Sequence, residues 1–555
     1  MLVQRSKNSS KIIKIGLDLD NTLIDYSDCL KEALSKLNIK INRTNSKSEI
    51  KEFIFKAGYK KKDWMKIQGL AYGHFITNRA KLFKGVLRFL KRSKINQYEL
   101  IIVSHKTERG HYLDESISIR QKALDFLSKK KIYYESDSSL IKKIEFFNTV
   151  DEKVDYINSN NFDIFIDDLP KVLNKIDQNK NIKLFRFSVR KKLTSCKKYT
   201  EFNNWFLIDE LINGYIQTKD IKLFFKNIKN IKNIKNINEG GNSRTFMVKN
   251  RNNFNYKIKF FNSNFFFNKL KHEVKASIFL QYHNFKIPKV LEVNAEFNYV
   301  MFEWIDGNKI IQPSTKNLNQ FLTFINNLNQ IKRLNHNCYS IKASASCYSL
   351  NDIERQFKTR FKKLNSSKYQ DEKFQSFLNQ KLYKSFSDYI YWIKNNENLD
   401  DIVYRKLQKE ELSLSPSDFG LHNSVESCNQ LFLFDFEYFG LDDPVKLISD
   451  FYYNPSNSFF TNTQKSKWLY KSINIANFSK VDVRLKYHMP LYGLIWCLII
   501  MNDFSDDVWS RRIQANEKLL NKRNIVLKSK LSNSINQYND VIKTINFVTN
   551  NELIN

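Results

Sequence analysis

The stretch from 415 to 444, SPSDFGLHNSVESCNQLFLFDFEYFGLDDP, most constrains what this chain can fold into. It places Asp418 five residues before Asn423, and an apolar, β-rich run, LFLF, then ends in Asp435. Phosphoryl transfer from ATP needs a carboxylate to orient the acceptor hydroxyl, and an amide oxygen and a second carboxylate to hold Mg²⁺. The Asp-x-x-x-x-Asn spacing is that of a kinase catalytic loop, so Asp418 fits the first role and Asn423 and Asp435 fit the other two.

A simpler interpretation is that an Asp and an Asn in a turn only cap the local backbone. The carboxylate at the end of the following strand favours the functional interpretation, because a motif match needs such a context. The letters DFG at 418–420 lie at the catalytic-loop position, and the predicted metal-binding aspartate is the one in DFE at 435–437.

The words SDFGLHN and LFLFDFEYFGLDDP resemble the aminoglycoside phosphotransferase/choline kinase family of small-molecule kinases. That family usually has H-G-D-x-H-x-x-N, and this sequence departs from it at Pro416, Ser417 and Gly420, while His422 stands next to the Asn. The resemblance implies a bilobal, protein-kinase-like domain, ATP and Mg²⁺ as cofactors, and a small acceptor that carries a hydroxyl group.

Residues upstream of this stretch are candidates for binding ATP. EGGNSRTFMV reads as a glycine-rich phosphate loop, although a plain hairpin turn explains it equally well. In NYKIKFF, Lys257 and Lys259 share one face of a strand, and the family's apolar–Lys–aromatic pattern favours Lys259. Glu273 would pair with it, unless it forms an exposed helix salt bridge. With the hinge-like YVMFEWIDG, the predicted ATP-binding residues are Gly240, Gly241, Asn242, Ser243, Lys259, Glu273, Glu303 and Ile305.

The N-terminal run KIIKIGLDLDNTLID is an apolar strand that ends in Asp18, Asp20 and Thr22. Ligands bind at the carboxyl ends of strands in an open parallel sheet, so both carboxylates can reach one Mg²⁺. An exposed acidic turn is the alternative interpretation. Two more apolar runs end in polar residues: ELIIVSHKTE reaches Ser104, and FDIFIDDLP reaches Asp167 and Asp168.

The Asp-x-Asp-x-Thr pattern and these later runs resemble the haloacid dehalogenase (HAD) superfamily. The resemblance implies that Asp18 attacks phosphorus and Asp20 acts as acid and base. A carboxylate that approaches an anionic phosphate needs Mg²⁺ and a nearby cation, and Lys153 fits this better than Lys142 or Lys143. Implied phosphate-binding residues are Thr22, Ser104 and Lys153, and implied metal ligands are Asp18, Asp20, Asp167 and Asp168.

The organisation predicted from these motifs is a two-domain chain of the α/β and α+β classes. Residues 1–210 form a Rossmann-like HAD domain, in which the mainly helical segment 27–90 is a cap. Residues 211–238 contain the repeat FFKNIKNIKNIKNIN and read as a lysine- and asparagine-rich linker. Residues 239–555 form the kinase-like domain.

Composition constrains the partners and the compartment. The net charge is +34, but the lysines are spread over all 555 residues and no reader motif occurs, which argues against nucleic acid. Six scattered cysteines without a CxxC pair favour a reducing compartment. No signal peptide is apparent, and the apolar run from Leu491 to Met501 is too short to span a membrane. We expect a cytoplasmic protein; the oligomeric state stays open.

The expected function is that of a bifunctional enzyme. It combines an Mg²⁺-dependent phosphatase with an ATP-dependent kinase for a sugar or amino alcohol, and analogy suggests precursors of surface polysaccharides. In one alternative, one half is silent and serves as a binding or regulatory module. In the other, the chain processes nucleic-acid ends, but it lacks the G-x-x-x-x-G-K-[ST] loop typical of such kinases.

Overall fold

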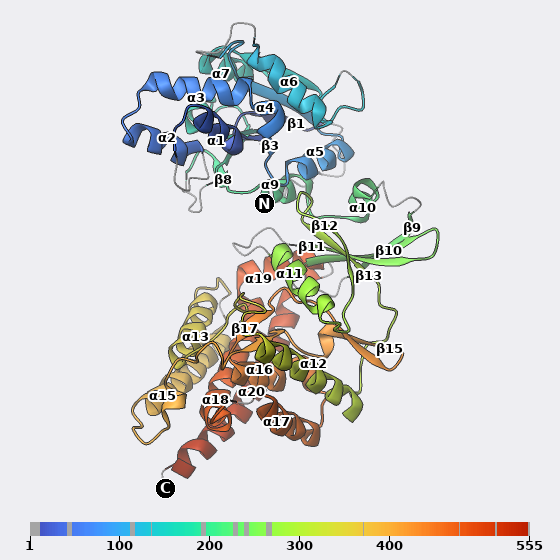
Figure 1. Cartoon of the computed structure of the whole chain (residues 1–555), viewed down its shortest axis with the longest axis vertical. Helices are drawn as coiled ribbons and strands as arrows, with labels where there is room; N and C mark the ends of the chain where they lie inside the picture. Colours follow the sequence, from blue (N-terminus) through green and yellow to red (C-terminus); the bar gives the residue numbers. More distant parts are fainter. Residues whose placement is uncertain are drawn as a thin grey trace. The chain divides into compact units, whose positions relative to one another are not determined.

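The computed structural model describes residues 12–40, 47–110, 117–134, 136–189, 196–225, 231–237, 243–261, 269–369, 371–476, 478–516 and 519–552. The chain divides into two compact units (Figure 1). Unit 1 comprises Met1–Lys229 together with Asn294–Asn298. Unit 2 comprises Asn230–Val293 and Tyr299–Asn555.

Unit 1 is built on a six-stranded sheet in which every registered pair of neighbours is parallel. Its short strands are apolar on both faces, as expected for a parallel sheet covered on two sides. In spatial order the strands are β5 (Lys143–Phe147), β4 (Glu99–His105), β1 (Lys14–Leu17), β6 (Ile164–Asp167), β7 (Lys183–Phe187) and β8 (Thr200–Phe202).

Helices cover both faces of this sheet. Alternate residues of β4 show the division: Leu100 and Ile102 belong to one apolar core, and Ile101 and Val103 belong to the other. The first core includes residues of α5 (Val86–Ile95), α6 (Ile119–Lys129) and α9 (Trp205–Asn213), together with residues of the helical insertion described next, and the second includes residues of α7 (Val150–Ser159) and α8 (Pro170–Lys175).

A helical insertion follows the first strand. It leaves and returns through the antiparallel pair β2 (Ile24–Asp25) and β3 (Lys81–Leu82). Its helices are α1 (Ser27–Lys36), α2 (Lys47–Lys56), α3 (Lys61–Gly73) and α4 (Ile76–Arg79). The predicted cap extended to residue 90, but α5, which begins at Val86, packs on β4 and α9 and is part of the covered sheet.

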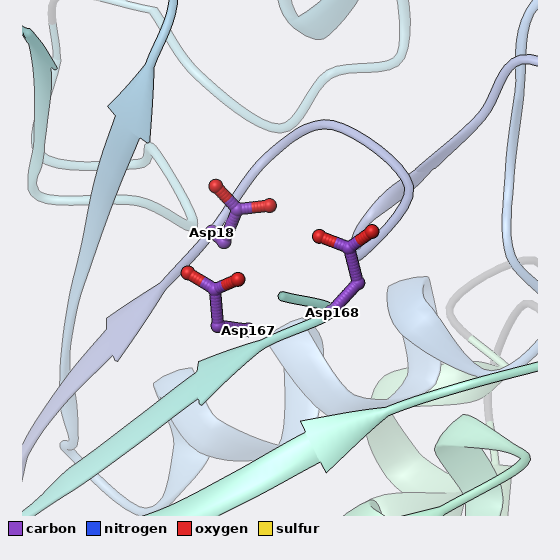
Figure 2. A group of neighbouring side chains, drawn as sticks. All are labelled: Asp18, Asp167 and Asp168. Atoms are coloured by element: carbon purple, nitrogen blue, oxygen red, sulfur yellow. The ribbon is translucent and has the colours of Figure 1, made fainter. Parts of the chain in front are cut away.

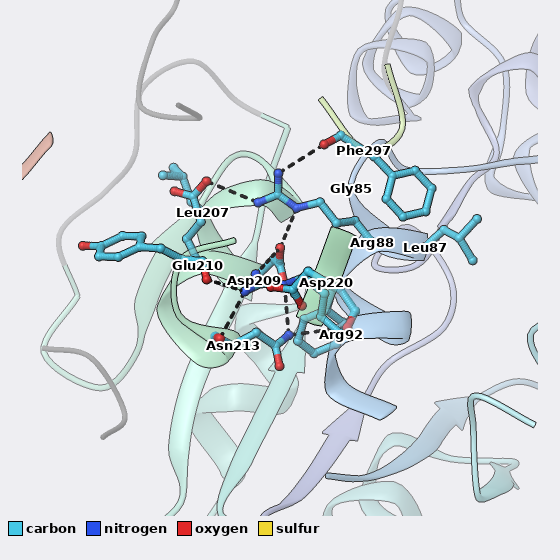
Figure 3. Close-up of polar contacts among 12 residues, drawn as sticks. Gly85, Leu87, Arg88, Arg92, Leu207, Asp209, Glu210, Asn213, Asp220 and Phe297 are labelled. Carbon is cyan, nitrogen blue, oxygen red and sulfur yellow. Dashed lines mark hydrogen bonds and ion pairs between the residues drawn. The ribbon is translucent and has the colours of Figure 1, made fainter. Parts of the chain in front are cut away.

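Buried ion pairs join α5 to the helices that close unit 1 (Figure 3). Arg88 Nε donates to Asp209 Oδ2 at 2.6 Å, and Arg92 Nη1 donates to the same oxygen at 2.9 Å. Arg92 Nε also reaches Asp220 Oδ1 at 3.1 Å. Both arginines are about 1% exposed, so their removal would leave uncompensated buried carboxylates.

The range 211–238, predicted as a linker, instead contains regular structure. Helix α10 (Thr218–Phe224) presents Asp220 to the buried Arg92, and β9 (Ile231–Ile237) is the edge strand of a sheet in unit 2. The period-three repeat gives no alternation of faces, which is why the sequence shows no strand pattern. Backbone hydrogen bonds to the neighbouring strand, which need no side-chain pattern, hold β9 in place.

Unit 2 begins with a five-stranded sheet. Its spatial order is β12 (Val290–Asn294), β13 (Tyr299–Glu303), β11 (Asn255–Phe261), β10 (Ser243–Asn250) and β9. The registered pairs, which are β9–β10, β10–β11 and β11–β13, are antiparallel. Helix α11 (Lys269–Tyr282) lies between β11 and β12 in the sequence and contacts β13.

The rest of unit 2 is mainly helical around the apolar helix α18 (Val481–Ile500), which packs on α13, α16 and α20. Its other helices are α12 (Thr315–Leu334), α13 (Leu350–Asn365), α14 (Glu372–Ser376), α15 (Lys384–Lys394), α16 (Pro444–Tyr453), α17 (Asn462–Ala476), α19 (Asp506–Ala515) and α20 (Arg523–Glu552).

Short elements connect these helices. The strands are β14 (Ser413–Ser415), β15 (Ser424–Ser427), β16 (Gln430–Leu433) and β17 (Gly440–Asp442). The short helical segments are η1 (Phe377–Tyr383), η2 (Asp401–Val403), η3 (Leu421–Asn423), η4 (Pro455–Asn457) and η5 (Met501–Phe504). Among the described residues, every helix is too short or too polar to cross a lipid bilayer.

Candidate active sites

The first candidate site lies where β1, β4 and β6 of unit 1 end at the same edge of the sheet. Asp18 follows β1, and Asp167 and Asp168 lie at the end of β6 (Figure 2). One oxygen atom from each of these three carboxylates lies within 4.8 Å of the other two. Three converging carboxylates are a donor set that suits Mg²⁺, which prefers oxygen ligands.

A buried lysine neutralises two of these carboxylates. Lys153, in the first turn of α7, donates to Asp18 Oδ1 at 2.6 Å and to Asp167 Oδ2 at 2.7 Å. Burial alone would lower the pKa of Lys153, but the two carboxylates raise it above its usual value. The competing lysines are elsewhere: the exposed Lys142 pairs with Glu99, and the exposed Lys143 pairs with Glu145.

Two hydroxyl groups lie at the same edge. Thr22 Oγ1 donates to Asp18 Oδ2 at 2.9 Å. The Ser104 side chain, near the end of β4, is fully buried, and its hydroxyl has no hydrogen-bond partner among the described residues. A buried hydroxyl without a partner is unfavourable unless a ligand completes it, so Ser104 fits a phosphate oxygen as its partner.

The carboxylates of this site are buried close together, and the negative charge of each raises the pKa of its neighbours. Burial raises the pKa of Asp18 to about 6; Lys153 opposes this shift and Asp167 adds to it. Burial and the charge of Asp18 raise the pKa of Asp168 well above its ordinary value. Such clustered acids are stable in the ionised form only when a cation compensates them, which again fits a divalent metal.

Asp20 does not join the metal cluster, although the sequence predicted it as a ligand. Its carboxylate is held by Lys106 Nζ at 2.7 and 2.9 Å and by the Tyr26 hydroxyl at 2.7 Å. Burial favours its neutral form, but Lys106 and Tyr26 lower its pKa. Lys106 was not predicted as a site residue from the sequence. It lies two residues after Ser104, the spacing that places strand residues on one face.

The second candidate site is in unit 2, around Lys259 on β11. Its ammonium donates to Glu273 Oε2 on α11 at 2.7 Å and to Asp435 Oδ1, beyond the end of β16, at 2.7 Å. Glu437 Oε2 lies 3.3 Å away. Lys257, the other candidate, is only partly buried, and its ammonium lies over the ring of Phe434, 4.2 Å from the centroid.

Glu437 and Lys269 complete this cluster and were not predicted. Lys269 Nζ donates to Glu437 Oε1 at 2.5 Å and to the Tyr438 hydroxyl at 2.7 Å. Oxygen atoms of Glu273, Asp435 and Glu437 lie within 4.8 Å of one another, so the group has the ligand chemistry of a cation site. The sequence feature that could have indicated Glu437 is its position two residues after Asp435, in DFE.

Asp435 has an unusual backbone. Its φ is +71°, in the left-handed region that residues other than glycine rarely adopt. Such strain concentrates at functional sites, where the surrounding structure holds a side chain in a required direction. The Asp435 side chain is 32% exposed, whereas its partner Glu273 is 3% exposed.

The residues of the predicted catalytic loop lie beside this cluster. Asn423 Nδ2 donates to the Asp418 carbonyl at 3.0 Å, and the Asn423 carbonyl accepts from Phe434 N at 3.1 Å. The second bond brings the end of β16, and with it Asp435, next to the loop. Because the amide nitrogen of Asn423 is engaged, its Oδ1 is the atom that could bind a metal.

His422 and Ser456 form a polar chain with Asp418. His422 Nε2 lies 3.1 Å from Asp418 Oδ1, and His422 Nδ1 lies 2.8 Å from Ser456 Oγ. Burial lowers the pKa of His422, but Asp418 raises it above its usual value. The chain orients the Asp418 carboxylate, which is 37% exposed and therefore accessible to solvent.

Asn457 holds the loop from the other side, and the sequence gave no signal for it. Its Oδ1 accepts from Leu421 N at 3.0 Å, and its Nδ2 donates to the carbonyls of Phe419 and Phe451. Gly420 permits this approach, because a Cβ there would lie 2.9 Å from Asn457 Oδ1 and 2.6 Å from Ser456 Oγ.

The predicted nucleotide-binding residues are only partly described. Gly240, Gly241 and Asn242 lie outside the described residues, and Ser243 begins β10, opposite Phe261. Glu303 ends β13, where its amide donates to the Lys289 carbonyl, and Ile305 is half-buried in the following loop. Beside the second site, a small cavity is lined by Lys257, Glu273, Ser277, Pro288, Phe302, Phe434, Asp435 and Phe436.

The ionisable groups of the second site shift one another's pKa values. Burial raises the pKa of Glu273 to about 7; Lys259 opposes this shift and Asp435 adds to it. Burial also favours neutral Asp435, but Lys259 lowers its pKa. The site can therefore hold an ionised carboxylate next to a lysine that stays protonated, which is the arrangement needed to bind metal-complexed phosphates.

No protein-family model and no curated protein matches the chain. Solved structures with a similar backbone are consistently small-molecule kinases and phosphotransferases. The choline kinase LicA from Streptococcus pneumoniae is 14% identical, with a TM-score of 0.39, and the match covers 58% of this chain and 98% of that one. A spectinomycin phosphotransferase, crystallised with ADP and spectinomycin, is 13% identical, with a TM-score of 0.40 and the same coverage.

An ethanolamine kinase from Plasmodium vivax is 15% identical, with a TM-score of 0.35; the match covers 54% of this chain and 84% of that one. At these identities and TM-scores, the similarity alone assigns neither fold nor activity to this chain.

Proposed function

We propose that unit 2 is an ATP-dependent kinase for a small molecule that carries a hydroxyl group. The observation that carries this proposal is the convergence of Lys259, Glu273 and Asp435 beside the loop that contains Asp418 and Asn423. These five residues come from four separate elements. They supply the cation, the carboxylates and the amide that phosphoryl transfer from ATP requires.

Each residue has a defined task in this proposal. Lys259 binds ATP phosphate oxygens and is held in place by Glu273. Asn423 and Asp435 would hold Mg²⁺, which supplies charge neutralisation on the phosphates. Asp418, oriented by His422, accepts the proton of the acceptor hydroxyl as its oxygen attacks the γ-phosphorus and the bond to ADP breaks.

We further propose that unit 1 is a phosphohydrolase of the HAD type. The supporting geometry is a carboxylate, Asp18, held by Lys153 and Thr22 among metal-binding acids at the switch region of a parallel sheet. Asp18 attacks phosphorus, the ester bond breaks as Asp20 gives a proton to the leaving oxygen, and water, whose proton passes to Asp20, then hydrolyses the aspartyl-phosphate. Asp167 and Asp168 would hold Mg²⁺ with Asp18, and Ser104 donates to a phosphate oxygen.

Asp20 is the acid–base residue of this second proposal. Its ion pair with Lys106 favours the ionised carboxylate, which is the form that accepts a proton from the attacking water. The two units would act at different positions of one phosphorylated small molecule, or at successive steps, because opposing reactions at one position would cancel.

The test is phosphorus NMR of the full chain with Mg-ATP and a panel of sugars, sugar phosphates and amino alcohols. We expect a new phosphoester that is lost in Asp418→Asn, and a dephosphorylation that is lost in Asp18→Asn. An activity that survives the substitution in its own unit would contradict the assignment of that site. A unit without activity that still binds ATP or phosphate would be a binding module.

A further inference from the structure

An arginine interrupts the apolar face of α13. The buried residues Ile353, Phe357 and Leu364 recur at helical spacing, and Arg360 occupies the position between the last two. The helix packs on α18 in the core of unit 2. A guanidinium at such a position is costly unless charged or polar partners compensate it.

Arg360 has no such partner in the described part of the chain. Its Nε is buried and makes no hydrogen bond with any described residue. Burial lowers the pKa of Arg360, and the nearby groups Asp450, Cys347 and Tyr438 only partly compensate. Native proteins rarely leave a buried guanidinium nitrogen unsatisfied without a ligand that completes it.

The nearest acid is already engaged elsewhere. Asp450 Oδ2 accepts from Lys446 Nζ at 2.7 Å, and Asp450 Oδ1 accepts from Trp496 Nε1 at 2.8 Å. Lys446 also pairs with Asp442 at 3.0 Å. Both oxygens of Asp450 are thus bound by other donors, and no ion pair forms between Asp450 and Arg360 in the described structure.

Tyr438 links Arg360 to the proposed catalytic loop. Its phenol interacts electrostatically with Arg360 and also with Asp418 and Asp435. Its carbonyl accepts from Ser417 Oγ at 3.0 Å, one residue before Asp418. Arg360 is therefore within electrostatic range of Tyr438, and the Tyr438 phenol is in turn within electrostatic range of Asp418, the group proposed to face the acceptor hydroxyl.

We infer that Arg360 binds an anionic group of the acceptor, a phosphate or a carboxylate, while the acceptor hydroxyl lies at Asp418. A guanidinium presents donors in a planar fork that matches such oxyanions. The inference rests on the proposed kinase function and narrows it: the acceptor is an anionic alcohol, such as a sugar phosphate or a sugar acid, and not a cationic amino alcohol.

Kinetics of the full chain with four matched acceptors tests this inference. Glucose, gluconate, the non-hydrolysable phosphonate analogue of glucose 6-phosphate, and choline differ mainly in charge, and the phosphonate is inert to unit 1. We expect the highest kcat/KM for an anionic member, and comparison of the two anions identifies the preferred group. Arg360→Met should raise the KM for the preferred anionic acceptor roughly 30-fold, with a smaller change in kcat. Arg360→Lys should bring this KM partly back towards the wild-type value.

The matched control is Arg355→Met, which removes an exposed arginine from the same helix and should leave KM unchanged. Thermal unfolding excludes a purely structural role. Removal of a partly buried and uncompensated charge should raise Tm by up to about 2 °C, whereas loss of a structural guanidinium would lower it. Equal or better turnover of glucose or choline, or an unchanged KM in Arg360→Met, would overturn the inference.

A binding measurement separates this inference from the kinase proposal. If ATP binds but no acceptor is phosphorylated, the kinase proposal fails. Calorimetry with the phosphonate then decides the inference alone: affinity that Arg360→Met lowers and Arg355→Met preserves supports it, and absence of binding by the wild type overturns it.

Discussion

Both candidate sites place a buried lysine between two carboxylates, but the two units build this arrangement differently. In unit 1, Lys153 joins Asp18 and Asp167, which end neighbouring strands of one parallel sheet. In unit 2, Lys259 joins Glu273 to Asp435, which follows a strand outside the sheet of Lys259. Strand pairing sets the positions of the two carboxylates of the first site, and Lys153 reaches them from α7, whereas the second site depends on how a sheet and a loop region meet.

The exposed fractions of the carboxylates also differ between the two sites. The side chains of Asp18 and Asp167 are 8% and 0% exposed, whereas that of Asp435 is 32% exposed. A site formed by one sheet can be almost closed before substrate binds. A site formed from two regions keeps one carboxylate accessible, which suits a reaction that must admit both a nucleotide and an acceptor.

Substitution of Lys153 or Lys259 tests this comparison, and these substitutions should have the largest effects. Lys153→Met leaves two buried carboxylates without a cation and should lower the free energy of unfolding by about 3–5 kcal/mol. Lys259→Met should cost less, because Asp435 can be solvated. Each should reduce its own activity at least roughly 100-fold. Urea unfolding and phosphorus NMR measure both effects.

Lys142→Met, which removes an exposed lysine of unit 1, is the control and should change the free energy of unfolding by no more than about 0.5 kcal/mol. Equal losses of stability in Lys153→Met and Lys259→Met would contradict the distinction between a closed and an open site.

The pH dependence of stability without metal should be intermediate in size. The folded-state pKa values of Asp18 and Glu273 are raised to about 6 and about 7, so the native protein binds protons more tightly than the unfolded chain. In EDTA, the free energy of unfolding should therefore rise as pH falls from 7 to 5, by about 1–3 kcal/mol.

Mg²⁺ should reduce this rise, because it stabilises ionised carboxylates. Phosphatase activity, which requires Mg²⁺, should change in the opposite direction and fall at a pH below about 6, because Mg²⁺ lowers the pKa at which Asp18 becomes protonated and can no longer attack. Tm measured against pH, with EDTA and with Mg²⁺, checks the stability, and phosphate release measured against pH checks the activity. Stability that falls from pH 7 to 5 in EDTA would show that the carboxylates are compensated in another way.

The smallest expected effect concerns the loop of unit 2. Asn457→Ala removes three hydrogen bonds to main-chain atoms, two of them at the loop. It should lower kcat of the kinase reaction about 10-fold and the free energy of unfolding by about 1–2 kcal/mol. Substitution of the exposed Asn335 is the control. Phosphatase activity should be unchanged, and an effect on it would mean that the units are coupled.

Several residues of the first site follow apolar runs that are short, β-rich and abruptly ended by polar residues. Such runs predict a parallel strand and the edge where it ends, which is why Asp18, Ser104 and Asp167 could be expected at one edge. Lys153 lies on a helix, and the resemblance to the HAD superfamily together with the need for a cation near Asp167 pointed to it. The partner of Asp20 could not be predicted, because ion pairing between Lys106 and Asp20 depends on side-chain directions that the strand pattern does not fix.

The second site was harder to predict for a related reason. Asp418, Asn423 and Asp435 lie close in sequence, so their spacing carried the signal. Asn457 lies in the separate helical segment η4 and contacts the loop from there. Its distance from the loop along the sequence gives no sign of this contact. Lys269 follows a strand and lies on a helix, where an exposed lysine is the usual interpretation.

Strand β9 has a consequence for how this chain can change length. Its repeat has a period of three residues, whereas a strand alternates faces with a period of two. A shift of three residues therefore places the same residue type at every position that pairs with β10, on either face. Insertion or loss of a single triplet within the repeat would leave the paired segment unchanged in sequence, whereas a change of one or two residues would alter both faces. Length variants of this repeat should therefore differ in steps of three residues.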